Sequence, residues 1–324
     1  MRRRPLLAAA LGSLVAPAVA RAQGAFPNRP IRVVSPFAPG GTSDGAIRAM
    51  NPVLERMLGH AMVVDNRPGA GGTVGTAHIA GERPDGYSLV LANAGPLAIA
   101  QTLFPRLPYN VASSFTYITL VGGAPIVCGV NPAGPIRTLA DYRAAAARRP
   151  EATSYGSAGV GSVGHLAGLL WAREAGVELL HVPFRGGGEA EAAMLGGSLG
   201  SLWNTLGAHA GSVRGGTIRA LAQTADRRVP SFPDIPSIVE AGFPNAVAIN
   251  WFVLAGPPGI PAEIVQRIRA AFAAAKADEA AAARVAALGL VDMGDPSPAE
   301  IQEFVNRETA RWAPVVRASG AEPN

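Results

Sequence analysis

A glycine turn, Phe37-Ala-Pro-Gly-Gly-Thr-Ser-Asp44, directly follows the apolar run 31–35 and is the first candidate binding segment of the chain. The run has the composition of a buried strand, and the periodicity that follows the turn predicts a helix over 43–58. Because the first N–H groups of a helix have no partner within it, such a turn aims several donors and the helix dipole at one point. This first turn (37–44) therefore predicts an anion site that needs no Lys or Arg.

A second turn of the same design (157–165) reads Ser157-Ala-Gly-Val-Gly-Ser-Val-Gly-His165, between a predicted strand and a predicted helix. Ligands of open α/β sheets bind beyond the carboxyl ends of the strands. Two lobes that each present such an edge would hold a ligand between them. Since no catalytic set of residues accompanies the turns, they indicate capture of a small carboxylate.

The segment Gly159-Val-Gly-Ser-Val-Gly164 also satisfies the dinucleotide pattern G-x-G-x-x-G. That pattern needs an acidic residue at the end of the next strand, where it would hold the ribose. The next predicted strand, 179–183, ends without Asp or Glu. An anion loop is therefore favoured over a cofactor site, and we expect no cofactor.

Ser162 lies in Val160-Gly-Ser-Val-Gly164, one glycine short of the nucleophile elbow of hydrolases. His165 is only three residues away, whereas the base of such enzymes comes from a distant loop. A helix N-cap with a ligand-facing hydroxyl is the favoured role for Ser162, and an exported serine hydrolase is the remote alternative. His165 either packs the second turn or contacts the ligand.

Other polar residues have open roles. Asp44 either complements the helix dipole and orders the turn, or orients a bound water or a ligand ammonium group. Arg185 could clamp a carboxylate or be a solvated loop residue. Cys128, the only cysteine, lies in an apolar run and is expected to be a buried thiol. No histidine is spaced with another His or Cys as a metal pair, so no metal is expected.

The N-terminus has the pattern of an export signal over residues 1–22: three arginines at 2–4, an apolar run to Ala20, and the cleavage pattern Ala20-Arg-Ala22. The full chain carries 28 basic and 23 acidic residues. Removing the four arginines of the signal leaves 24 basic against 23 acidic residues, a net charge of +1. No basic patch for nucleic acid survives, and 302 residues suffice for two domains.

Short β-branched runs alternate with helix-period runs, which is typical of a layered α/β fold. Strands are predicted at 31–35, 61–65, 88–92, 117–121, 125–130, 153–156, 179–183, 199–203, 218–224 and 249–255. Helices are predicted at 43–58, 73–82, 138–148, 163–174, 188–196, 206–213, 235–241, 261–287 and 298–317, the last with Ser297 as its N-cap.

Taken together, collinear segments of the chain resemble one family closely. The segments are Pro30 to Asp44, Asp65-Asn-Arg-Pro-Gly-Ala-Gly-Gly-Thr-Val-Gly75, Arg83-Pro-Asp-Gly-Tyr-Ser-Leu89, Tyr155 to His165, His181-Val-Pro-Phe-Arg-Gly-Gly187, Ile218-Arg-Ala-Leu-Ala222 and Phe232 to Pro244. On these segments the chain is similar to solute-binding proteins of the tripartite tricarboxylate transporter family, the Bug type.

The resemblance implies a two-lobed periplasmic binding protein of type II, a Venus flytrap in which each lobe is a mixed, mainly parallel sheet flanked by helices. It implies a lobe 1 of residues 23–123 plus 225–324 and a lobe 2 of residues 124–224. The connections would run near Val121-Gly-Gly-Ala124 and Ala222-Gln-Thr224. Small residues there suit a hinge.

The resemblance also implies the function: a monomeric periplasmic receptor, not an enzyme, that delivers a carboxylate to membrane permease subunits. A sensor-only receptor is the alternative. Dicarboxylates, tricarboxylates, acidic amino acids and aromatic acids all remain candidates, because the chain departs from its relatives at Arg185 to Glu189, Asn204 and Gly211-Ser212. The implied ligand-binding residues are Phe37, Ala38, Gly40, Gly41, Thr42, Asp44, Ala94, Ser157, Gly159, Gly161, Ser162, His165 and Asn204.

Overall fold

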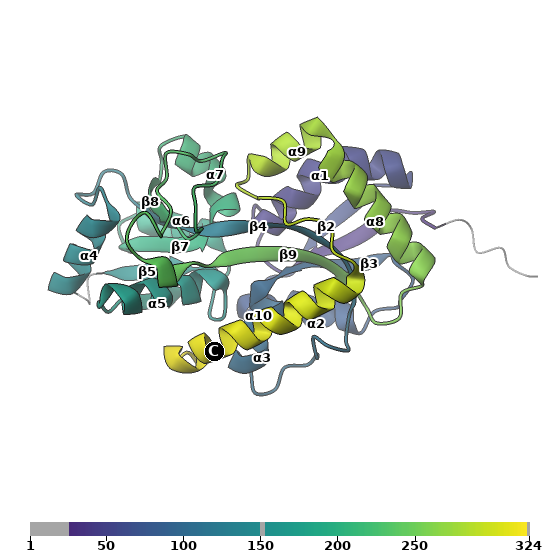
Figure 1. The fold of residues 1–324 in the computed structure, drawn as a ribbon, viewed down its shortest axis with the longest axis horizontal. Helices are drawn as coiled ribbons and strands as arrows, with labels where there is room; N and C mark the ends of the chain where they lie inside the picture. Colours follow the sequence, from purple (N-terminus) through teal and green to yellow (C-terminus); the bar gives the residue numbers. More distant parts are fainter. Residues whose placement is uncertain (1–25, 150–152, 323–324) are drawn as a thin grey trace, which may run out of the picture.

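The computed structural model describes residues 26–149 and 153–322 (Figure 1). The expected export signal at 1–22 lies outside the described residues. The strands are β1 (Ile31–Ser35), β2 (Met62–Asn66), β3 (Ser88–Asn93), β4 (Thr116–Val130), β5 (Ser154–Ser157), β6 (Leu180–Pro183), β7 (Ser201–Thr205), β8 (Arg219–Gln223) and β9 (Ile249–Gly256). Among the described residues, no helix has the length and apolar character needed to cross a membrane.

The longer helices lie between and after these strands. They are α1 (Thr42–Leu58), α2 (Thr73–Ala80), α4 (Leu139–Arg148), α5 (Val163–Ala175), α6 (Gly187–Leu195), α7 (Leu206–Arg214), α8 (Ala262–Ala277), α9 (Glu279–Ala286) and α10 (Pro298–Ser319). Shorter helical segments are η1 (Ala70–Gly72), the π-helical η2 (Gly95–Ile99), α3 (Ala100–Leu103) and η4 (Pro244–Ala246).

The strands form one continuous sheet in the order β2-β1-β3-β9-β4-β7-β5-β6, with β8 paired to β4. β4 pairs with β9 up to Pro125 and with β7 and β8 from Ile126 onward. We call the part on the β9 side, with its helices, lobe 1, and the part beyond Pro125 lobe 2. Figure 1 shows β4 and β9 running side by side through the middle of the molecule.

The sheet is mixed, as expected, but it is not mainly parallel throughout. The outer strands pair in parallel: β1 with β2 and β3, and β5 with β6 and β7. Every pairing described for β4 and β9 is antiparallel. The two long strands β4 and β9 run in opposite directions between the lobes. β9 is antiparallel to β3, the neighbouring strand of the lobe 1 set, and β4 is antiparallel to β7, the neighbouring strand of the lobe 2 set.

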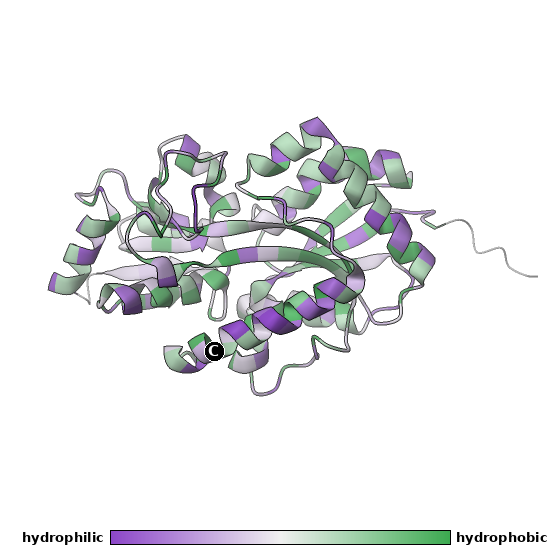
Figure 2. Ribbon diagram, in the orientation of Figure 1, coloured by the Kyte–Doolittle hydropathy of each residue, from purple (hydrophilic) through white to green (hydrophobic). Residues whose placement is uncertain are grey.

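Side chains of alternate strand residues pack against different helices, as the period of a strand requires. In lobe 1, Leu89 and Leu91 of β3 share a core with α1 and α8, whereas Val90 and Ala92 share one with η2 and α10. In lobe 2, Leu202 packs with α6 and α7, and Trp203 packs with α4 and α5. In Figure 2 hydrophobic and hydrophilic segments alternate along the helices.

The predicted elements agree closely with the observed ones, with three corrections. The runs 117–121 and 125–130 are one strand, β4, because the glycines between them stay paired to β9. The helix predicted over 261–287 breaks at Asp278, whose side chain caps α9 by accepting from the Ala281 N–H. No helix forms over 235–241, where turns follow the bridge from Gln223 to Ser237.

A helical segment at 95–103 was missed because its small and apolar residues are buried and carry no polar face. The N-cap predicted at Ser297 is confirmed, and Glu300 completes a capping box.

The chain between β8 and β9 packs against lobe 2, although the predicted boundary would give it to lobe 1. Its Val229, Phe232 and Ile235 share a core with Leu202 and Leu206. The helix α10 starts against lobe 1 and ends beside α5 of lobe 2, so it spans both lobes (Figure 1). The exact division of the chain into lobes stays a prediction.

Candidate functional site

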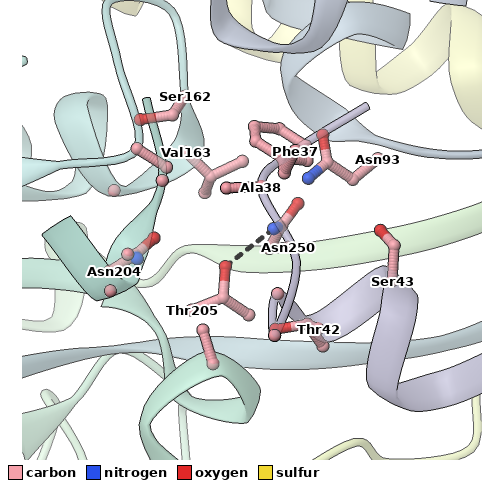
Figure 3. A pocket seen from close by; sticks show the side chains of 18 of the residues that line it. Phe37, Ala38, Thr42, Ser43, Asn93, Ser162, Val163, Asn204, Thr205 and Asn250 are labelled. Carbon is pink, nitrogen blue, oxygen red and sulfur yellow. Dashed lines mark hydrogen bonds between the residues drawn. The ribbon is translucent and has the colours of Figure 1, made fainter. Parts of the chain in front are cut away.

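A cavity of about 200 Å³ lies between the two lobes. Figure 3 shows side chains from both lobes and from the crossing strand β9 turned toward this space. It is lined by Phe37, Ala38, Pro39, Gly40, Gly41, Thr42, Ser43, Asn93, Ala158, Ser162, Val163, Gly164, Gly186, Gly187, Gly188, Asn204, Thr205, Ala208, Asn250 and Phe252. None of these residues carries a charged side chain.

Four helices begin at the cavity wall: α1 from lobe 1 and α5, α6 and α7 from lobe 2. Three of them, α1, α6 and α7, have no side-chain hydrogen bond at the N-cap, which is Gly41, Gly186 and Thr205 respectively. Their first N–H groups are thus left for solvent or a ligand, and each helix adds partial positive charge. This convergence makes the cavity suited to an anion although it contains no cation.

Buried polar atoms without a partner also face the cavity. They are Thr42 Oγ1 and Ser43 Oγ on the first turn of α1, and Asn250 Oδ1 on β9. The amide nitrogen of Asn250 donates to Thr205 Oγ1 over 2.9 Å (Figure 3). A buried polar group without a hydrogen bond costs free energy, so these three atoms indicate that a ligand or water completes the site.

The first turn is held in shape from behind. The carboxylate of Asp44 accepts from the Gly40 N–H at 3.1 Å and from Arg48 Nε at 2.8 Å. Gly40 has φ +81, a conformation that suits glycine. Asn66 Nδ2 donates to the Phe37 carbonyl at 3.1 Å and ties the turn to β2. Asp44 does not line the cavity, so the structure gives it the ordering role.

The second turn bonds mainly to itself. Ser162 Oγ accepts from the His165 N–H at 3.3 Å, which caps α5, and lies 3.1 Å from Ser157 Oγ. Ser157 Oγ lies 2.7 Å from His181 Nε2, and His165 Nδ1 accepts from the Gly161 N–H at 3.3 Å. Ser162 is therefore the N-cap that the sequence predicted, and its hydroxyl has little capacity left.

His165, the last residue of the second turn, stacks on His181 of β6 with ring centroids 4.0 Å apart. Burial lowers the pKa of His165 to about 4. Burial, and then the neighbouring His165, lower the pKa of His181 to about 3. Both rings are therefore neutral near pH 7 and act as hydrogen-bonding parts of the scaffold.

The lobes touch at glycines on both sides of the cavity. A Cβ built on Gly71 would lie 2.5 Å from the Val160 carbonyl oxygen of the other lobe. One on Gly186 would lie 2.9 Å from Ala38 Cβ, and one on Gly207 would lie 2.6 Å from Thr42 Cγ2. The close approach of the lobes thus depends on the absence of side chains at these positions.

The predicted ligand-binding residues fall into two sets. Those that line the cavity are Phe37, Ala38, Gly40, Gly41, Thr42, Ser162 and Asn204. Gly159 lines a neighbouring cavity of about 400 Å³, which shares Phe37 and Ala158 with the first. Asp44, Ala94, Ser157, Gly161 and His165 line neither and lie behind the lining residues.

The prediction missed several lining residues, chiefly Ser43, Asn93, Asn250 and the glycines at 186–188. Asn250 could have been found, because it is an amide in the otherwise apolar strand predicted at 249–255. Three consecutive glycines before a helix are the same signal as the first turn. Asn93 directly follows the buried run of β3, where polar residues reach a sheet edge.

Comparisons with known proteins agree with this architecture. The family described as "Tripartite tricarboxylate transporter family receptor" matches residues 46–321. The protein BugT of Bordetella pertussis is 33% identical over 92% of this chain and 91% of its own length.

Two solved structures from Rhodopseudomonas palustris are each 30% identical to the chain. One, with adipate, has a TM-score of 0.87 and covers 92% of this chain and 100% of its own. The other, MatC with bound malate, has a TM-score of 0.83 and covers 90% and 100%. The protein is therefore a two-lobed α/β periplasmic binding protein in fold, and it belongs to the receptor family of the tripartite tricarboxylate transporters.

Proposed function

We propose that this protein is a periplasmic solute-binding receptor that captures a small carboxylate between its lobes for a tripartite tricarboxylate transporter. The observation that carries the proposal is the convergence of three uncapped helix N-termini on one cavity. The unpartnered hydroxyls of Thr42 and Ser43 add donors on the lobe 1 side. Donors from both lobes favour a shared guest over two separate ones.

The chemistry of capture follows from these donors. Hydrogen bonds to a charged group each contribute about 1.5–3 kcal/mol, and they are stronger away from water. A carboxylate held by N–H groups of both lobes favours the arrangement in which the lobes are close, so binding would select the closed form. The family's role supports a partner in the membrane, the permease subunits, which would receive the closed form.

The remaining parts of the proposal rest on the relatives and the sequence. Related structures with malate and with adipate support a carboxylate guest. The export pattern at 1–22 supports a periplasmic location, and we expect a monomer. We infer binding without turnover, since the Ser162 hydroxyl serves as the N-cap of α5 and His165, three residues on, accepts from the Gly161 N–H.

In the proposed site the residues that line the cavity contact the ligand. They are Phe37, Ala38, Gly40, Gly41, Thr42, Asn204 and Ser162, the last with its hydroxyl bonded within the second turn. We propose that Asp44, Ala94, Ser157, Gly159, Gly161 and His165 act from the next layer, where they hold the two turns in shape.

A thermal-shift screen of the mature chain tests the proposal. The panel holds succinate, malate, adipate, citrate, aspartate and benzoate, each with its methyl ester as the control that lacks the carboxylate charge. A ligand at 100 times its Kd would stabilise the fold by about 2.7 kcal/mol. We expect at least one free acid to raise the unfolding temperature while its ester does not. Equal shifts for acids and esters, or none at all, would refute carboxylate capture. Recovery of the acid unchanged, checked by NMR, tests for turnover.

A further inference from the structure

Asn204 stands at the end of β7, and its amide is one end of a hydrogen-bonded row that runs away from the cavity. Asn204 Nδ2 lies 3.1 Å from Nε2 of His209. On the other side of the ring, His209 Nδ1 lies 2.6 Å from Glu191 Oε2. The second carboxylate oxygen of Glu191 accepts from the Ser212 hydroxyl.

The row has a fixed direction. The hydrogen bonds from His209, first, and from Ser212 hold the pKa of Glu191 below its usual value, so this side chain is a carboxylate that can only accept. The ring Nδ1, which faces this acceptor, therefore carries a proton, and Nε2, which the Asn204 amide nitrogen faces, presents a lone pair. Asn204 must turn its NH₂ group toward that lone pair. Its carbonyl oxygen is then the free end at the cavity.

The row is enclosed by the packing around it. The His209 side chain has 0% exposure. Gly187 lies against both partners: a Cβ there would overlap Asn204 Nδ2 and lie 2.8 Å from His209 Nε2. Glycine at this position thus makes room for the amide to meet the ring.

A second acceptor faces the same space. Asn250 donates its NH₂ group to Thr205, which leaves Asn250 Oδ1 buried and without a partner. Asn204 and Asn250 therefore both offer carbonyl oxygens, in contrast to the donors at the helix N-termini, whereas the oxygen of the third amide in the wall, Asn93, accepts from the Gly95 N–H. A guest that carries only carboxylate oxygens would satisfy the helix N-termini and leave these two acceptors unpaired.

We propose that Glu191 and His209 position the Asn204 amide so that the site selects carboxylates that also carry a hydrogen-bond donor, a hydroxyl or an ammonium group. The inference rests on the proposed function and narrows its substrate class to hydroxy and amino acids. In this arrangement the carbonyl oxygens of Asn204 and Asn250 accept a hydrogen bond from the hydroxyl or ammonium group of the ligand, and the helix N-termini bind its carboxylate. Glu191 and His209 do not touch the ligand and act through the orientation of Asn204.

Calorimetric titration with three acids of one skeleton tests the selection: succinate, its hydroxy derivative malate and its amino derivative aspartate. For the wild type we expect malate or aspartate to bind about tenfold more tightly than succinate, the value of one hydrogen bond. In Glu191→Gln the charge that fixes the ring proton is gone, so the preference should fall to about one while the succinate Kd changes less than about threefold. Glu178→Gln, an exposed residue of lobe 2, should keep the wild-type preference.

The protonation of His209 gives a readout that a merely structural role would not move. In ¹⁵N spectra of the histidine side chains, assigned with His209→Gln, we expect a proton on Nδ1 and a bare Nε2 in the wild type. Glu191→Gln should shift this pattern together with the selectivity.

Binding of all three acids with equal affinity, or an unchanged preference in Glu191→Gln, would overturn the inference and leave carboxylate capture standing. Failure of these three acids to bind would overturn the inference, and failure of the whole panel of acids in the thermal-shift screen would overturn carboxylate capture as well.

Discussion

The first turn (37–44) and the second turn (157–165) have the same design in sequence, yet they use their polar groups in opposite ways. In the first turn the hydroxyls of Thr42 and Ser43 have no partner in the structure, and α1 starts at Gly41 without a side-chain cap. In the second turn Ser162 caps α5 and joins a hydrogen-bonded network with Ser157 and His181. The first turn leaves hydrogen-bond donors free for a ligand, whereas most polar groups of the second turn already have hydrogen-bond partners within the protein.

The difference changes where lobe 2 meets a ligand. Its free donors come from the starts of α6 and α7, near Gly187 and Thr205, more than from the glycine pattern at 159–164. The second turn instead supports the wall and packs against lobe 1, with its Val160 carbonyl beside Gly71. Two similar sequence motifs can thus have different roles: the first turn presents donors to the ligand, and the second supports the wall of the cavity.

The largest expected contrast between the turns is their response to acid. The pKa of His165 falls to about 4 and that of His181 to about 3 in the folded chain, chiefly because both are buried. In the unfolded chain the two histidines bind protons near pH 6.5, whereas in the folded chain the buried rings stay neutral to lower pH. The stability that depends on neutral rings is therefore complete above about pH 6.5 and is lost as the pH falls below it. Each histidine should lower the free energy of unfolding by about 1.4 kcal/mol for every pH unit between roughly pH 6 and pH 4.

Denaturant unfolding at several pH values measures this slope. His165→Gln combined with His181→Gln should flatten it between pH 6 and 5. Carboxylates with lowered pKa, such as Glu82, lose their contribution only as the pH falls further, through their folded values. A slope that survives in the double variant would mean that the second turn is not the acid-sensitive part.

Next in size is the effect of filling the first turn. Gly41 has φ −68 and ψ 166, which valine can adopt, so Gly41→Val should fold. Its side chain would stand over the free N–H groups of α1 and block charge-assisted hydrogen bonds, so affinity should fall at least about 100-fold. Titration of the best acid from the screen measures the loss. Gly81→Val, at an open site outside the cavity, is the control. Near-normal affinity of Gly41→Val would remove the first turn from the site.

The contrast between the turns also explains how far the sequence could predict the molecule. Strand composition and helix period found the elements well, since β1 and α5 lie within a residue of their predicted ends. The glycine turn and helix start at 37–44 predicted the lobe 1 wall for a physical reason, uncapped N–H groups. The use of Ser162 as a cap was predicted too, but its network with Ser157 and His181 depends on β5 pairing with β6.

Other parts of the site arise only from tertiary packing. Asn250 and Asn204 line the same cavity because β9 and β7 both pair with β4, a neighbour relation that no local pattern encodes. The row from Asn204 through His209 to Glu191 likewise joins β7, α7 and α6. Hydrogen-bond partners across elements are therefore the main content that the sequence alone could not supply.

A smaller effect is expected where the lobes meet beside the first turn. Gly186 has an extended backbone, φ −175, so alanine is not strained there. Its new Cβ would lie 2.9 Å from Ala38 Cβ, closer than contact distance, and would hold the lobes apart. Gly186→Ala should weaken binding about tenfold, or about 1.4 kcal/mol, and give a larger radius of gyration with ligand in X-ray scattering.

Gly211→Ala is the matched control for that variant. It lies in α7 with no atom near its Cβ position and outside the cavity, and alanine should stabilise the helix by up to about 1 kcal/mol. Equal affinities for the two variants would mean that the lobes do not close through the contact between Gly186 and Ala38.

The smallest effects are expected when one hydroxyl is removed from each turn. Ser162→Ala removes the cap of α5 and should cost about 1 kcal/mol of stability, while affinity changes less than about threefold, because the lost hydroxyl was already bonded within the turn. Ser43→Ala removes a hydroxyl without a partner inside α1, so stability should hold or rise slightly, while affinity falls about threefold to tenfold. Urea unfolding and calorimetry on the same preparations give both quantities. If Ser162→Ala lost the affinity and Ser43→Ala lost the stability, the roles of the turns would be the reverse of those argued from their hydrogen bonds.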